Sequence, residues 1–364
     1  MSPEVDVAAL ATQVVVSAFA LGAVFGAIVH RTNFCTMGSI ADIVAFGDWT
    51  RMRMWALAIA VAVAGTAALA TVGLIDPADS FYTTSRFTPV AYVVGGLLFG
   101  FGMVLAGGCG SKALVRAGAG SLKGLVVICV LGLVAYITLR GVLGVVRVKA
   151  LEAVGFELAT SQDLPALLGV ARLVVAAILV LALLFFALRD RASRTREVLV
   201  GGIGVGAVIV AVWFVSGHVG HVIEHPRTLD EVYLRTNSGR MEALSFVAPV
   251  AWTLDYLMFF SDASKVVTLG VAAVGGVFAG AALSALLSGR FRWEGFRDTE
   301  DTANHLVGGA LMGFGGVTAM GCTIGQGLSG VSMLALGSFI TLAAIVAGAV
   351  AGLRYQSWRI ERME

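Results

Sequence analysis

Three of the four cysteines in this chain stand in similar surroundings, which suggests that they act on a small solute. Cys109 and Cys322 each follow a glycine-rich apolar segment and precede a turn of small or polar residues. Cys35 follows another apolar segment, within the polar interruption 33–38. Glycine beside a thiol lets backbone and ligand approach closely. The pattern therefore predicts ligand-facing thiols, whereas the alternative is the usual behaviour of a buried cysteine as a small hydrophobic side chain.

The spacing of these cysteines narrows the chemistry open to them. The chain has no Cys-x-x-Cys pair, so the usual spacing of metal and redox sites is missing. A nucleophilic cysteine needs a positioned base, and no histidine lies near Cys109 in the sequence. A thiol in apolar surroundings stays protonated and is a soft, weak hydrogen-bond donor. Such a donor suits brief contact with a sulfur-bearing anion, because a lysine or arginine at that depth would bind the anion tightly and is expensive to bury.

The segments that lead to Cys109 and Cys322 are copies of each other. Residues 94–109 and 307–322 align without a gap, 213 residues apart (109 to 322). Both hold Val-Gly-Gly and then Gly-Phe-Gly, and both end in Gly-Cys. A weaker echo, Gly-x-x-x-Gly followed nine residues later by cysteine, leads to Cys35, and 276–289 repeats it with glycine in the last place. We therefore expect a duplicated unit, with up to four related units in all.

The elements that carry the cysteines are predicted to be membrane-spanning helices. Of the 364 residues, 58% are hydrophobic and 13% are charged, against roughly a quarter charged in a soluble protein. The chain has 46 glycines but only 6 prolines, which suits close packing of helices in a bilayer. The net charge of +2 gives no indication of nucleic-acid binding. Glu4 and Asp6 replace the basic region of a signal peptide, so the first apolar run is expected to be a retained span.

Apolar segments recur at 8–29, 55–75, 90–108, 124–146, 165–188, 198–215, 248–260, 265–288, 305–321 and 331–353. A crossing needs about 20 apolar residues, so 248–260, which is short and holds Asp255, is predicted to be re-entrant or interfacial. Basic residues gather in the alternate loops and in the C-terminal tail, most clearly at 189–197. The positive-inside tendency places these loops in the cytoplasm. Nine crossings result, with the N-terminus outside and the C-terminus inside.

These segments predict an all-α polytopic membrane protein that forms a single domain over residues 1–364. In the orientation above, 90–108 runs inward and its copy 305–321 runs outward, so the duplication is inverted. The two pseudo-repeat halves span roughly 1–150 and 198–353. Inverted repeats are common in secondary transporters, whose solute sites lie near the midplane where the repeats meet. We therefore expect about nine transmembrane helices in two inverted halves, with short re-entrant helices and loops meeting near the midplane.

The paired motifs, together with the Asn-Phe-Cys run at 33–35, resemble the YeeE/YedE family of sulfur-compound transporters over most of the chain. The resemblance implies a multi-pass importer of the bacterial inner membrane, not an enzyme, that carries thiosulfate or a similar small sulfur anion. It implies that Cys35, Cys109 and Cys322 line the path and hydrogen-bond the passing ion through their S–H groups, with Cys109 most central. It implies no cofactor and no metal, and a small TusA-like sulfur-carrier protein as a cytoplasmic partner.

Residues beside the cysteines complete the expected substrate site. The full set is Cys35, Gly108, Cys109, Gly110, Gly321, Cys322, Thr323 and Gln326. Gln326 and Ser329 suit either donation to anion oxygens or packing between helices. Lys112, Arg116 and Lys123 either draw an anion to the cytoplasmic mouth or reflect only the positive-inside topology.

Other readings of these residues stay open. One is a carrier for selenium or for reduced sulfur such as sulfide. Another is a membrane thiol oxidoreductase, although the adjacent resolving thiol that such an enzyme needs is missing. Cys129, inside an apolar run, is expected to serve packing alone. His218, His221 and His225 fit either a metal site on the outer face or the exposed side of an interfacial helix.

Overall fold

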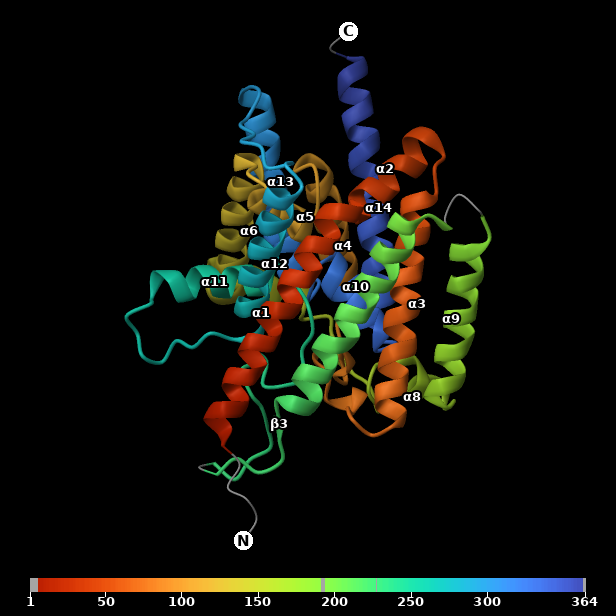
Figure 1. Cartoon of the computed structure of the whole chain (residues 1–364), viewed down its shortest axis with the longest axis vertical. Helices are drawn as coiled ribbons and strands as arrows, with labels where there is room; N and C mark the ends of the chain where they lie inside the picture. The colour runs from red at the N-terminus through yellow and green to blue at the C-terminus, as the bar shows by residue number, and fades with distance from the viewer. Residues whose placement is uncertain (1–5, 191–193, 227, 363–364) are drawn as a thin grey trace.

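The computed structural model describes residues 6–190, 194–226 and 228–362, so Glu4 and Arg191 of the arginine-rich loop lie outside the described part. Its long helices are α1 (Val7–Thr32), α3 (Thr50–Thr71), α4 (Pro89–Leu105), α6 (Leu122–Arg140), α9 (Arg172–Leu188), α10 (Arg196–Phe214), α12 (Leu269–Leu287), α13 (Thr299–Thr318) and α14 (Leu336–Glu361). These helices form one bundle, and the start of α1 and the end of α14 lie at opposite ends of it (Figure 1).

Short elements connect the long helices. The short helices are α2 (Thr36–Phe46), α5 (Gly110–Gly118), α7 (Val142–Val146), α8 (Leu164–Leu168) and α11 (Ala248–Met258). Single turns are η1 (Pro77–Asp79), η2 (Phe81–Thr83), η3 (Arg147–Leu151), η5 (Val215–Val219) and η6 (Gly325–Gly330). Two antiparallel pairs of strands join the loops at one end, β1 (Arg86–Phe87) with β2 (Phe156–Glu157) and β3 (His221–Val222) with β4 (Val232–Tyr233). Arg86 lies opposite Glu157 in the first pair, and His221 lies opposite Tyr233 in the second.

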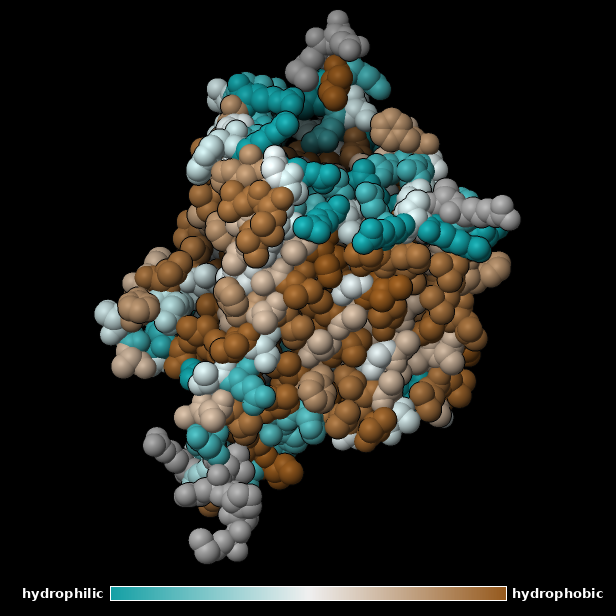
Figure 2. Space-filling view, viewed as in Figure 1, coloured by the Kyte–Doolittle hydropathy of each residue, from teal (hydrophilic) through white to brown (hydrophobic). Residues whose placement is uncertain are grey.

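The surface of the bundle is that of a membrane protein. In the described part, seven helical segments are long and apolar enough to cross a membrane, and they contain α1, α3, α4, α6, α10, α12 and α14. Helix α9 has 17 residues, and α13 opens with polar turns. Figure 2 shows a broad hydrophobic belt between more hydrophilic ends. The predicted all-α polytopic fold is therefore confirmed, whereas the number of nine crossings stays a prediction.

Glycines bring neighbouring helices into backbone contact, and their partners give the direction of each pair. A Cβ built on Gly22 of α1 would lie 2.5 Å from the carbonyl oxygen of Ala273 in α12, and one on Gly26 would lie 2.2 Å from that of Val277. The residue numbers rise together along both helices, so α1 and α12 are parallel. By the same test α3 is parallel to α10, α4 to α14 and α6 to α13. Small residues permit this close approach in membranes.

The two copied segments, in contrast, pack antiparallel. A Cβ on Gly95 of α4 would meet the backbone of Ala319, whereas one on Gly102 would meet Gly308. The residue numbers run in opposite directions, so α4 and α13 are inverted with respect to each other. Exchanging α1 with α10, α3 with α12, α4 with α13 and α6 with α14 reproduces every one of these helix pairs.

This arrangement corrects the expected kinship between 276–289 and the segment before Cys35. Helix α12 packs parallel to α1 and takes the place equivalent to α3, so the two segments are not inverted counterparts. The counterpart of α1 is α10, where Gly202 and Gly206 contact α3 just as Gly276 and Gly280 of α12 contact α1. The Gly-x-x-x-Gly spacing recurs because each close helix pair needs small residues, and it does not by itself mark kinship.

The short segment at 248–260 forms helix α11, which lies across the side of the bundle (Figure 1). Its 11 residues are too few to cross a bilayer. Asp255 is 4% exposed and accepts a hydrogen bond of 2.6 Å from Lys265 Nζ. The salt bridge with Lys265 therefore offsets part of the free-energy cost of burying the Asp255 carboxylate among apolar residues.

The histidine run does not form the expected interfacial helix. His218 lies in the turn η5 and stacks on Phe214, with 5.1 Å between ring centroids. His221 lies in strand β3, stacks on Tyr233 and has its Nε2 2.6 Å from Glu231 Oε1. Among the described residues, no group of three or more His, Cys, Asp or Glu side chains is placed to hold a metal ion.

Candidate functional site

A helix ends shortly before each of the three candidate cysteines. In each case the residue two positions before the cysteine has a left-handed backbone conformation and ends the helix. These residues are Asn33 after α1, Gly107 after α4 and Met320 after α13, with φ angles of 54°, 67° and 57°. In both copied segments the next N–H closes the helix with a 2.8 Å bond to the carbonyl five residues back. Asn and Gly adopt this conformation readily, whereas a methionine there is strained. The turn ends each span and places a cysteine at the start of the next helix.

Cys35 and Cys322 use their sulfur atoms in the same way. The N–H of Gly38 donates to Cys35 Sγ at 3.4 Å, and the N–H of Gly325 donates to Cys322 Sγ at 3.4 Å. The two cysteines are 5% and 1% exposed. Because each sulfur accepts from an N–H group at a helix start, its own S–H proton stays free to donate.

Cys109 precedes α5 and is placed differently. Its Sγ lies 3.3 Å from Ser111 Oγ, and the side chain is 1% exposed. A Cβ on the adjoining Gly110 would lie 3.1 Å from the carbonyl oxygen of Phe246, so the backbone is close-packed at this point. The sulfur is near enough to the other two candidate thiols to interact with them electrostatically. Cys109 thus lies near both of the other candidate thiols, although the sequence separates the three widely.

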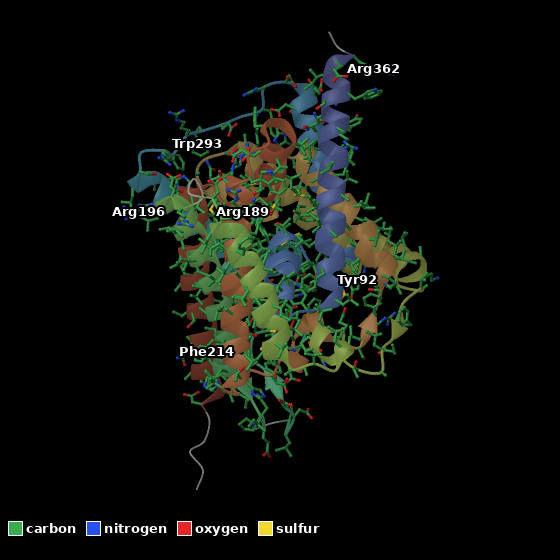
Figure 3. The ribbon with its side chains drawn as sticks, turned by 90° about the vertical axis from the view of Figure 1, so that its right-hand side faces the viewer. Tyr92, Arg189, Arg196, Phe214, Trp293 and Arg362 are labelled. Atoms are coloured by element: carbon green, nitrogen blue, oxygen red, sulfur yellow. The ribbon has the colours of Figure 1, made fainter. Side chains whose placement is uncertain are left out.

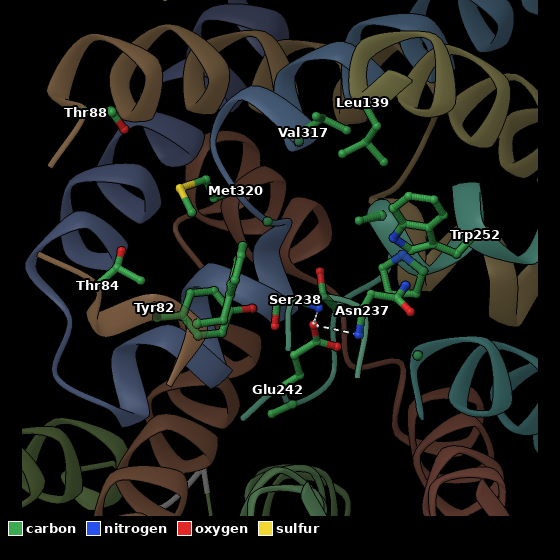
Figure 4. Close-up of a pocket in the computed structure, with 18 of the residues that line it drawn as sticks. Tyr82, Thr84, Thr88, Leu139, Asn237, Ser238, Glu242, Trp252, Val317 and Met320 are labelled. Carbon is green, nitrogen blue, oxygen red and sulfur yellow. Dashed lines mark hydrogen bonds between the residues drawn. The ribbon is translucent and has the colours of Figure 1, made fainter. Parts of the chain in front are cut away.

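A cavity of about 500 Å³ lies near the end of the bundle where α4 begins, and its wall reaches the residues before Cys322 (Figure 4). Its wall includes Met320 and Gly321, which directly precede Cys322. It also includes Ser245, whose Oγ lies 3.9 Å from Cys322 Sγ. Tyr82 lines the same cavity, and its hydroxyl lies 3.0 Å from where a Cβ on Gly325 would be. The cavity therefore borders the segment that contains Cys322.

The polar groups of this cavity include a half-buried carboxyl, that of Glu242. Oε1 of Glu242 accepts hydrogen bonds from the backbone N–H groups of Asn237 at 3.1 Å and Ser238 at 2.7 Å (Figure 4). Burial raises the pKa of Glu242 because the charged form loses its hydration, although these bonds act in the opposite direction. Arg147 lines the cavity as an ion pair with Glu152.

The basic residues after Cys109 lie on the other side of the thiols, and each has a polar partner. Lys112 Nζ donates to Asn33 Oδ1 at 2.7 Å, which ties α5 to the turn before Cys35. Arg116 is 3.5 Å from Glu294, and Lys123 is 2.7 Å from Asp301. Of the three, Lys112 is the one that joins two cysteine-bearing turns.

The residues expected beside Cys322 fall into two groups. Gln326 donates to the carbonyl of Ala319 at 2.6 Å and accepts from Ser338, while Ser329 donates to the carbonyl of Leu244 at 2.9 Å. These contacts favour packing between helices for both side chains. Thr323, in contrast, is fully buried, and its hydroxyl has no hydrogen-bond partner in the part of the chain that the structure describes.

Sequence reasoning missed Tyr82, Ser245 and Phe246, which come from connections between helices. No motif surrounds them, and only the folded chain brings them to the copied cysteines. Cys129 was expected to pack inside the protein, but it is exposed on α6. An apolar surface faces lipid in a membrane protein, so an apolar run does not identify the buried side of a helix.

Comparison with known proteins agrees with this picture. The family model described as "Sulphur transport" matches residues 31–351. The chain belongs to the sulphur transport family. The thiosulfate transporter TsuA of Escherichia coli is 26% identical to it over 356 residues, covering 92% of each chain. The thiosulfate transporter TsuA of Spirochaeta thermophila is 26% identical over 344 residues, covering 90% of this chain and 94% of the relative.

Membership of the sulphur transport family confirms the resemblance that the paired motifs indicated. The chain is a multi-pass membrane transporter of sulfur compounds and not an enzyme. The oxidoreductase reading is set aside, and all four cysteines are free thiols.

Proposed function

We propose that this chain imports thiosulfate across a bacterial inner membrane and passes it from thiol to thiol through a narrow, dry constriction. The observation that carries the proposal is the meeting of three buried free thiols, each at the start of a helix, beside the antiparallel pair α4 and α13. The two relatives named as thiosulfate transporters support the choice of substrate.

The distribution of arginine supports the orientation in the membrane on which the proposed path depends. Figure 3 shows Arg189, Arg196 and Arg362 toward the end of the bundle that holds the C-terminus, with Phe214 toward the opposite end. The positive-inside tendency makes the arginine-rich end cytoplasmic. The cavity of about 500 Å³ then faces the outside, and the thiols lie between it and the cytoplasm.

The proposed path begins in this outer cavity, where Arg86 and Arg147 attract the anion. The anion then meets Cys322 beside Ser245, next Cys109, and last Cys35. Thiols are weak donors, so each contact orients the ion and releases it again. Gly108, Gly110 and Gly321 keep the backbone close to the path, because any side chain would narrow it.

On the cytoplasmic side, Lys112 is placed to receive the ion as it leaves the thiols, since its ammonium group already reaches the turn before Cys35. A TusA-like sulfur carrier is the cytoplasmic protein that we expect to accept the released sulfur. Capture of such a carrier by the purified transporter in the presence of thiosulfate tests this part separately.

The test of the proposal is uptake of radiolabelled thiosulfate by cells that lack every other route for sulfur. Cys109→Ala should lower uptake about 10- to 100-fold, because a hydrogen bond to a charged group is worth about 1.5–3 kcal/mol. The matched control is Cys129→Ala, which removes an exposed thiol and should leave uptake unchanged. Both variants are compared at equal amounts of monodisperse protein. Unchanged uptake by Cys109→Ala would refute the thiol path, and wild-type cells that take up no thiosulfate would refute the substrate.

A further inference from the structure

Two buried threonines that directly follow candidate cysteines have hydroxyls without a hydrogen-bond partner among the described residues. Thr36 directly follows Cys35, and Thr323 directly follows Cys322. Thr36 is 4% exposed and Thr323 is 0% exposed, and within the described part of the chain neither hydroxyl oxygen has a hydrogen-bond partner. Such isolation is unusual for a buried polar group, because an unmet hydrogen bond inside a protein costs free energy.

Their position in the helix explains why these hydroxyls are unpaired. Elsewhere in the chain, Thr32, Thr66 and Thr318 donate to the backbone carbonyl four residues earlier, as buried threonines in helices commonly do. Thr36 and Thr323 are the first residues of their helices, so no preceding helical turn offers a carbonyl. Their O–H groups remain as unused donors at the helix starts.

The two threonines belong to a repeated motif with one geometry. Residues 35–38 and 322–325 both read Cys-Thr-x-Gly, and in each the glycine N–H donates to the cysteine sulfur at 3.4 Å. Each motif therefore offers two donors on consecutive residues, a soft S–H and a hard O–H. Cys109 departs from this pattern, because Gly110 follows it and Ser111 supplies the nearest hydroxyl.

We propose that Thr36 and Thr323 read the oxygen atoms of the transported anion, so that each motif binds a sulfur atom and an oxygen atom together. This inference rests on the proposed function and deepens it. The favoured substrate class is a small anion that carries both sulfur and oxygen acceptors, as thiosulfate does. Sulfide and selenide lack oxygen and would leave both hydroxyls unpaired, so the pair of motifs selects against them.

The test uses purified transporter in liposomes and measures the half-saturating concentration for thiosulfate. Thr36→Val and Thr323→Val keep the shape of the side chain and remove the hydroxyl, and each should raise this concentration about tenfold. Thr36→Ser and Thr323→Ser keep the hydroxyl and should stay close to wild type. The inhibition constant of hydrosulfide, which offers sulfur without oxygen, should not change in any of the four variants.

Thr341→Val is the matched control. Thr341 on α14 is also buried with an unpaired hydroxyl, but no cysteine adjoins it in the sequence. This variant should therefore bind thiosulfate as the wild type does. Valine variants within twofold of wild type, or serine variants as impaired as the valine variants, would overturn the inference. If Cys109→Ala abolishes uptake while the valine variants are normal, the inference fails and the proposed function stands.

Discussion

Replacing Gly280 by alanine tests the packing that holds the first cysteine-bearing span in place. A Cβ at this position of α12 would lie 1.9 Å from the carbonyl oxygen of Ala23 in α1. An ordinary contact is roughly 3.4 Å, so the two helices must separate by about 1.5 Å. The obstacle is backbone, which cannot turn aside as a flexible side chain does. Helix α1 ends at the turn before Cys35, so the displacement reaches the thiols.

The expected cost follows from two opposing effects. Overpacking costs about 1–3 kcal/mol, and exchange of a helical glycine for alanine returns up to about 1 kcal/mol. Gly275→Ala on the same helix is the control, because its Cβ would lie 3.7 Å from the ring of Phe19. That variant should gain the higher helix propensity of alanine without a steric clash. The free energies of unfolding of the two variants should therefore differ by about 2 kcal/mol.

The assay is the thermal unfolding midpoint of each variant in detergent, together with thiosulfate uptake by cells. Gly280→Ala should unfold several degrees below Gly275→Ala and should transport more slowly. A midpoint for Gly280→Ala that equals or exceeds that of Gly275→Ala would show that α1 and α12 do not touch as described.

Two further predictions concern topology and pH. Reporter proteins fused after residues 86 and 300 should report opposite sides of the membrane, because α4 and α13 run in opposite directions; reporters on the same side would contradict the inverted packing. Glu242 is neutral below its raised pKa and charged above it, so acidifying the outside through the range above the usual glutamate pKa should raise uptake of the anion about two- to fivefold. The other titratable and charged groups that line this cavity are Tyr82, Arg86, Arg147 and Glu152. Glu242→Gln should keep the acid level of uptake at every pH, and an unchanged pH profile in this variant would count against the carboxyl as the cause.

Much of the architecture could be predicted because it depends on local composition. Long apolar runs place helices, and the length of a run decides whether it can cross, as α11 shows by failing to do so. The doubled motif before Cys109 and Cys322 predicted two equivalent units, and loop arginines predicted their opposite directions. The Gly-x-x-x-Gly spacing at 276–289 wrongly suggested a unit related to the segment before Cys35, because the same spacing occurs wherever two helices pack closely. The histidine run also misled, because pairing of β3 with β4 overrides the helical reading.

Only part of the candidate site could be predicted from the sequence. The glycines around the cysteines predict that these residues belong to the site. No local sequence pattern around Ser245 or Tyr82 predicts that they line it. Gln326 stays a predicted ligand residue, and its side-chain amide already bonds to Ala319 and Ser338. A sequence shows which side chains could donate a hydrogen bond, but not which of them already have a partner.

The sequence by itself determined that this protein lies in a membrane, that two of its spans are duplicated, and that a thiol ends each copy. Tertiary structure alone decided that α10 is the counterpart of α1, and that the hydroxyls of Thr36 and Thr323 have no partner among the described residues. Membrane insertion and the positions of helix ends can be predicted from the sequence, because both depend on residues that are neighbours in the chain. The meeting of helices depends on backbone contacts between residues far apart in the sequence, which no local pattern specifies.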